Sequence, residues 1–180
     1  MHRIVIVCAL ALILAPAVVQ ANAIGLSFST EFIEDAGLVA EVEVFELYVY
    51  VQTDLSAIYG YGASFTWESA TLLLIDAVWP MASVNVGDGD DNHLVGFAEP
   101  FPVDDWAVVC TLVYLNVAEL GPSAISVRPA DPPEIDPPSP MIIDPDDPGL
   151  FHACVGVPAF INFAVAQEAH SLSDIKALFQ

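Results

Sequence analysis

The segment WAVVCTLVYLN, residues 106–116, is the strongest strand signal in the chain. Side chains at alternate positions of an extended strand point to the same face. The face that we expect to be buried consists of Trp106, Val108, Cys110, Leu112 and Tyr114. Because such a face needs a second layer to cover it, this segment predicts a packed β domain.

Strand-like segments continue outward from it in both directions. They cover residues 24–32, 39–52, 61–67, 72–78, 94–97, 124–128, 151–155 and 159–166. Turn residues separate these segments, and none of them has a helical period, so the pattern predicts an all-β protein, an antiparallel β-sandwich. Within 39–52 the apolar residues change face near Val44–Phe45, which predicts a bulge or a break there.

The first 23 residues have the form of a secretory leader. A basic start, Met1-His2-Arg3, precedes an apolar run from Ile4 to Val19, and Ala21-Asn22-Ala23 is a small-x-small cleavage pattern. An uncleaved anchor is the alternative, but a membrane span needs about 20 apolar residues, and Pro16 interrupts this shorter run. We therefore expect a protein that begins at Ile24 and is exported to the periplasm, cell surface or medium.

Three regions follow from this reading: a signal peptide (1–23), a sandwich domain (24–166) and a C-terminal tail (167–180). In the tail, Ser171 begins a capping box, and Leu172, Ile175, Leu178 and Phe179 share one side of a short amphipathic helix. Residues 129–149 hold eight prolines and six acids. Strand-like sequence resumes after them, so we expect a long surface loop and not a linker between domains.

The charge balance excludes two classes of partner. The chain has 24 Asp and Glu against 3 Lys and Arg, a formal net charge of −21. Binding to nucleic acid or to an anionic membrane surface needs clusters of basic residues, which this chain lacks. Solubility outside the cell, cation binding, a basic partner and adaptation to salt remain open as reasons for the charge.

Two cysteines, Cys110 and Cys154, remain after removal of the leader. Cysteines of exported proteins usually pair, so we predict a Cys110–Cys154 disulfide that closes the proline-rich loop. A catalytic thiol is the alternative, but no basic cluster flanks either cysteine to lower its pKa.

The acidic turn between two strands is the best candidate for a metal site. Asp88, Asp90, Asp91 and Asn92 offer the oxygen ligands that Ca²⁺ prefers. His93 stands where an EF-hand needs glycine, so the candidate is a looser calcium site in a β-loop, and a plain acidic turn is the alternative. Residues 144–149 form a second acidic cluster. We expect no other cofactor.

A binding face is predicted on the strand 45–51. If Leu47, Val49 and Val51 face the core, Tyr48 and Tyr50 point outward and could contact a sugar or a protein. The catalytic motifs GxSxG, HExxH and the phosphate loop do not occur. We therefore expect no enzyme, although a hydrolase that uses paired carboxylates is an alternative.

Three segments carry a resemblance to a known class of domain: FELYVYV (45–51), VNVGDGDDNHLVGFA (84–98) and AVVCTLVYL (107–115). They resemble cohesin-type and carbohydrate-binding sandwiches, and small exported bacterial proteins of that fold. The resemblance implies a cohesin-like jelly roll that binds protein or polysaccharide at the cell exterior without catalysis. A calcium-ordered adhesion module is the function that we expect, and a polysaccharide hydrolase and a structural envelope protein are the alternatives.

Overall fold

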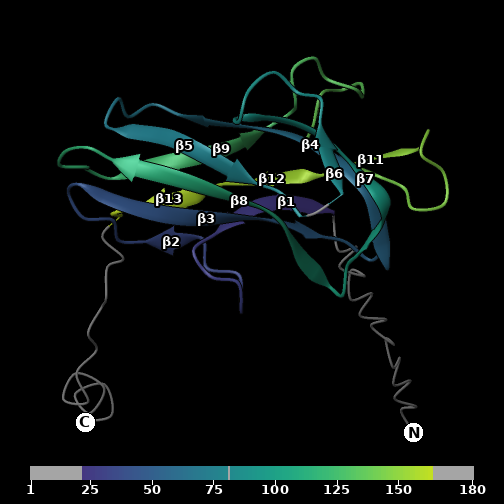
Figure 1. Cartoon of the computed structure of the whole chain (residues 1–180), viewed down its shortest axis with the longest axis horizontal. Helices are drawn as coiled ribbons and strands as arrows, with labels where there is room; N and C mark the ends of the chain where they lie inside the picture. The colour runs from purple at the N-terminus through teal and green to yellow at the C-terminus, as the bar shows by residue number, and fades with distance from the viewer. Residues whose placement is uncertain (1–21, 81, 164–180) are drawn as a thin grey trace, which may run out of the picture.

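The computed structural model describes residues 22–80 and 82–163, and in them the chain forms two stacked β-sheets. Figure 1 shows the longer strands of both sheets running along the long axis of the molecule. Sheet A has five strands in the order β12 (Val155–Val157), β1 (Ala23–Ser27), β3 (Glu43–Gln52), β8 (Trp106–Asn116) and β5 (Leu72–Val78).

Sheet B has eight strands and is centred on β4. One path runs through β11 (Phe151–Ala153), β10 (Met141–Ile143), β4 (Ala57–Trp67), β9 (Ser123–Arg128), β13 (Ala159–Ile161) and β2 (Ala36–Gly37). Also in this sheet, β7 (Asn92–Pro102) pairs with β4, and β6 (Ser83–Asn85) pairs with β7. Pairing is antiparallel except for β1–β12 and β2–β13, which are parallel. The predicted sandwich is therefore confirmed, with two parallel pairs that the sequence pattern did not indicate.

The core lies between the two sheets. Leu47, Val49 and Val51 of β3 face Tyr61 and other residues of β4, and all are fully buried. Burial of these apolar side chains between the layers is what drives the two sheets together.

A bulge in β8 changes the face that its first residues present. Val49 pairs with Cys110, but Tyr50 pairs with Val108, so Val109 has no partner of its own. Beyond this bulge the alternation reverses, and Trp106 packs edge-on against Tyr50 on the outer side of sheet A, with 6.3 Å between ring centroids. The prediction of one continuous face was right for Leu112 and wrong for Trp106.

The predicted break in the run 39–52 lies slightly earlier than expected. β3 begins only at Glu43, after a turn in which Val42 has a φ of +54°. Positive φ is uncommon for a β-branched residue and ends regular pairing. Leu38 and Val42 are consequently exposed, at 85% and 72%.

The proline-rich region is not loop throughout. Met141–Ile143 form β10, which pairs with β4 on one side and β11 on the other. The predicted helix in 167–180 and the leader in 1–21 lie outside the described residues. Among the residues that are described, none forms a helix long and apolar enough to cross a membrane.

Candidate functional site

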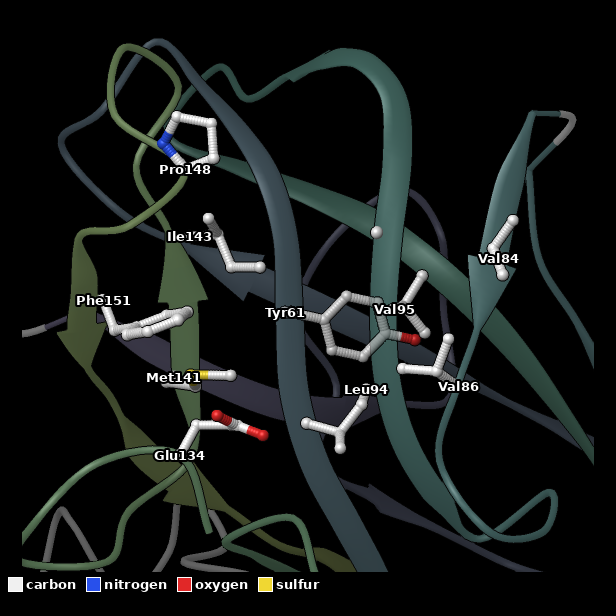
Figure 2. Close-up of a pocket in the computed structure, with 11 residues that line it drawn as sticks. Tyr61, Val84, Val86, Leu94, Val95, Glu134, Met141, Ile143, Pro148 and Phe151 are labelled. Atoms are coloured by element: carbon white, nitrogen blue, oxygen red, sulfur yellow. The ribbon is translucent and has the colours of Figure 1, made fainter. Parts of the chain in front are cut away.

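An apolar groove of about 340 Å³ lies on the outer face of sheet B. Figure 2 shows Val84 and Val86 along one side, Met141, Ile143 and Phe151 along the other, and Leu94 between them. Val84 and Val86 are 63% and 74% exposed. Large exposed aliphatic side chains along one side of an apolar groove mark it as the candidate binding site.

The groove exists because the outward positions beneath it carry glycine. Gly60 and Gly62 alternate with Tyr61, whose ring points into the core. A Cβ at Gly62 would lie 2.8 Å from Met141 Cε and 3.2 Å from Leu94 Cδ2, so these side chains occupy the space that a larger residue would take. A Cβ at Gly96 would meet nothing within 4 Å, and Gly96 therefore lies at the open part of the groove.

Among the described residues that line the groove, Glu134 alone contributes a carboxyl group. It comes from the proline-rich segment 129–149, which also contributes Met141, a residue that is 3% exposed. The site is thus apolar, with an acidic group at its margin, in a chain whose net charge is −21.

His93 holds the inner side of β7 in place. Tyr61 Oη lies 2.8 Å from His93 Nδ1, and His93 Nε2 lies 3.0 Å from the carbonyl oxygen of Asp90. Because that carbonyl can only accept, Nε2 carries the proton and Tyr61 donates to Nδ1. Burial lowers the pKa of His93 to about 4, so the ring is neutral at pH 7. The local sequence around His93 does not indicate this structural role.

The hairpin between β10 and β11 positions Pro148 and Phe151 at the groove. Asp144 organises its turn, because the backbone N–H groups of Asp146 and Asp147 donate to its Oδ1 at 2.8 and 3.1 Å. His152 Nε2 lies 2.8 Å from Asp144 Oδ2. This hydrogen bond and the backbone donors hold the pKa of Asp144 below its usual value. The second acidic cluster, residues 144–149, is therefore a turn whose backbone N–H groups are bonded by the side chain of Asp144.

The acidic loop 88–92 does not gather its side chains. Asn92 is 8% exposed, and its amide is bonded to the backbone of Asp131 in both directions, at 2.6 and 3.0 Å. In the described part of the chain, no three His, Cys, Asp or Glu residues are grouped so as to hold a metal ion. Calcium binding by Asp88, Asp90, Asp91 and Asn92 stays a prediction.

The predicted tyrosine face is not formed. Tyr48 is only partly buried and donates to Glu46 at 2.7 Å, but Tyr50 is 2% exposed. The Tyr50 ring lies over Gly25 of β1, where an added Cβ would come within 2.4 Å of it, and meets Trp106 at its edge. The expectation of two exposed rings was therefore wrong for Tyr50.

The predicted Cys110–Cys154 disulfide is also absent, and both thiols are free and buried. Cys110 lies in the core beside Tyr61, whereas Cys154 lies beside the backbone of Ile142 and His152. Burial raises the pKa of each thiol to about 12, which makes either one a poor nucleophile. The two cysteines act as small core residues.

Comparison with solved structures identifies the architecture. The fold is that of a cohesin module. A cohesin module from a Clostridium perfringens family 33 glycoside hydrolase aligns with a TM-score of 0.55 and 9% identity, covering 79% of this chain and 98% of that one. A type II cohesin from the cellulosome of Acetivibrio cellulolyticus aligns with a TM-score of 0.53 and 14% identity, covering 79% and 96%.

The sixth cohesin of Acetivibrio cellulolyticus scaffoldin B, solved in complex with a dockerin, has a TM-score of 0.55 and 10% identity, covering 79% of this chain and 99% of that one. At these identities the likeness concerns the fold alone. No family model matches the chain. A search of curated proteins likewise finds no match.

Proposed function

We propose that this cohesin-like sandwich is a non-catalytic module that binds another protein through the groove on the outer face of sheet B. The observation that carries the proposal is the exposed aliphatic lining of Val84 and Val86 around the open position at Gly96. An apolar side chain of the partner would enter there as the anchor of the interface, where hot spots are typically buried in a pocket.

The chemistry of the lining favours a protein over a polysaccharide. Sugars are held by many polar groups and by flat exposed rings, but the described lining of this groove has a single carboxyl, that of Glu134, and mostly apolar walls. The tyrosine platform that would have suited a glycan is covered at Tyr50. A single carboxylate also offers no pair for glycoside hydrolysis at this site.

Charge complementarity defines the partner further. With a net charge of −21 and Glu134 at the margin of the groove, the chain attracts a partner that surrounds its apolar anchor with Lys or Arg. Solved cohesins bound to dockerins show that a sandwich of this fold can bind a protein. The predicted leader would place this binding outside the cytoplasm.

The test uses a synthetic amphipathic peptide with leucine on one helical face and lysine on the other, followed by fluorescence anisotropy at physiological salt. Gly96→Leu adds a side chain at the open part of the groove, where a Cβ would meet nothing within 4 Å, and Gly121→Leu is the matched control, because a Cβ at Gly121 also meets nothing within 4 Å. We expect Gly96→Leu to weaken binding at least about tenfold, the effect of ~1.4 kcal/mol, and the control to bind as the parent does.

Equal binding of both variants would show that the peptide is held by charge alone and would contradict the proposed site. Affinity electrophoresis in soluble polysaccharides provides the second arm. If a polysaccharide retards the parent protein in the gel, and Gly96→Leu abolishes that retardation, the assignment of a protein partner would be contradicted.

Calcium ordering of the loop 88–92 is a separate part of the proposal. A site of the extracellular type would raise the melting temperature in millimolar calcium by roughly 3–10 °C. Magnesium at matched ionic strength is the control for screening, and Asp90→Ala should abolish the rise. Equal melting in the two salts would leave the loop as an acidic turn.

A further inference from the structure

The first strand of sheet A in chain order, β1, starts with a residue that the predicted processing would remove. Ala23 is the first residue of β1, is 7% exposed, and pairs with Val155 on one side and Gln52 on the other. The residue before it, Asn22, accepts a hydrogen bond at its carbonyl oxygen from Val155 N at 2.8 Å. Cleavage after Ala23 would delete both residues from the sheet.

The side chain of Asn22 is also part of the fold. The hydroxyl of Thr53, a residue that is 2% exposed, donates to Asn22 Oδ1 at 2.7 Å. Removal of Asn22 would leave this buried hydroxyl without that acceptor, and it would leave the N–H of Val155 without its partner at the edge of β12. Buried polar groups that lose their partners cost the fold their desolvation energy.

The charge created by cleavage distinguishes the two positions further. Peptide hydrolysis leaves an ammonium group on the new first residue, which must be solvated or paired. Ile24 is 0% exposed and lies between β12 and β3, so an ammonium group there would be buried in the middle of sheet A. Asn22 is only partly buried and lies outside the strand, where water can reach a charge.

Two bonds in this region carry alanine at the scissile position and an uncharged apolar residue two positions before it. Ala21-Asn22-Ala23 fits cleavage before Ile24, and Val19-Gln20-Ala21 fits cleavage before Asn22, with alanine at the scissile bond in both. The sequence pattern alone does not separate them. The contacts of Asn22 and Ala23 in the folded chain do.

We propose that the leader is removed between Ala21 and Asn22, so that the exported protein begins at Asn22 and keeps the whole of β1. A signal peptidase of the exporting cell would catalyse the hydrolysis. Water adds across the amide bond, the carboxylate stays on Ala21, and the ammonium group appears on Asn22. The proposal depends on the predicted leader and is independent of the groove.

The test is the N-terminus of the protein after secretion of the full chain by a bacterial host, measured by intact mass and N-terminal sequencing. We expect Asn22. A chain that begins at Ile24, or one that keeps the leader, would overturn the proposal. Val19→Asp alters the pattern at the first bond only and should abolish this processing, whereas Ala23→Val alters it at the second and should leave Asn22 as the first residue.

A second measurement tests the physical reason. Chains that begin at Asn22 and at Ile24, each released from a fusion partner without extra residues, are compared by thermal unfolding. Loss of two hydrogen bonds lowers the melting temperature by roughly 4–8 °C in a domain of this size, and the buried ammonium adds to the loss. Equal melting temperatures would show that Asn22 and Ala23 do not distinguish the two products and would overturn the inference.

Discussion

Asn92 and His93 adjoin in the sequence, and both have structural roles that a search for metal ligands could not reveal. Asn92 bonds to Asp131, 39 residues away, and His93 bonds to Tyr61, 32 residues away. An Asp/Asn-rich turn has the same local composition whether it holds an ion or a distant backbone segment. Only the tertiary pairing decides between them.

Asn92→Ala should destabilise the protein by about 1–3 kcal/mol, because it removes both hydrogen bonds to Asp131. Urea unfolding in calcium-free buffer measures the loss. Asp88→Ala, which changes an exposed residue of the same loop, is the control and should cost less than about 0.5 kcal/mol. Equal losses in the two variants would contradict the role of Asn92.

His93 should make the fold less stable in mild acid. Its pKa of about 4 in the folded chain lies below the value of about 6.5 expected in the unfolded chain, so between these pH values only the unfolded chain binds the proton. The contribution is present above pH 6.5 and is lost, up to about 3 kcal/mol, as the pH falls toward 4.

The measurement is the stability difference between the parent and His93→Gln across this pH range. The difference should shrink as the pH falls for His93→Gln. A difference that does not change with pH would contradict the account.

At the scale of elements, the strands were predictable and their exact faces were not. The alternation of 106–116 predicted β8, and its bulge at Val109 was invisible because both neighbours of the bulge are apolar. β10 was hidden by the prolines around it. Its pairing with β4 brings Met141 over Gly62, a contact across 79 residues of sequence, and this contact makes the groove. Tyr50 was placed on the correct outer side, but Trp106 covers it from beyond the bulge.

The two cysteines should behave as buried thiols. A disulfide closing their loop would contribute about 4 kcal/mol, so reductant would lower the melting temperature by several degrees if one were formed. We expect reductant to have no effect. Thiol titration should find both cysteines unreactive in the folded protein and both reactive in urea. A folded protein that shows no free thiols when it is titrated in urea without reductant would contradict the structure.

The β10–β11 hairpin should control the groove through Asp144. Asp144→Ala removes the acceptor of its turn and should weaken peptide binding about fivefold, the effect of ~1 kcal/mol, through the displacement of Pro148 and Phe151. Asp146→Ala is the matched control. Equal peptide affinities of the two variants would contradict this role.

The folded pKa of Asp144 is lowered, so the ionised carboxyl of Asp144 stabilises the fold above the ordinary carboxyl pKa. This stabilisation is lost as the pH falls through the lowered pKa.

At the scale of the whole molecule, the fold could be predicted and the site could not. Short strands, turns and the resemblance of three segments indicated a cohesin-like sandwich, and the solved cohesin structures confirm it. The groove required knowledge of which strands neighbour one another, since its walls come from β6, β7, β10 and β11. The acidic composition predicted the kind of partner to be excluded, but not the surface that would receive the right one.

The central claim is that a protein partner binds the outer face of sheet B. Methyl chemical-shift mapping of the full chain with the leucine–lysine peptide tests it most directly. We predict shifts at the methyl groups of Val84, Val86 and Leu94, and none at Val78 and Val155, which are also exposed but belong to sheet A. Shifts at Val78 and Val155 with Val84 and Val86 unchanged would contradict the claim.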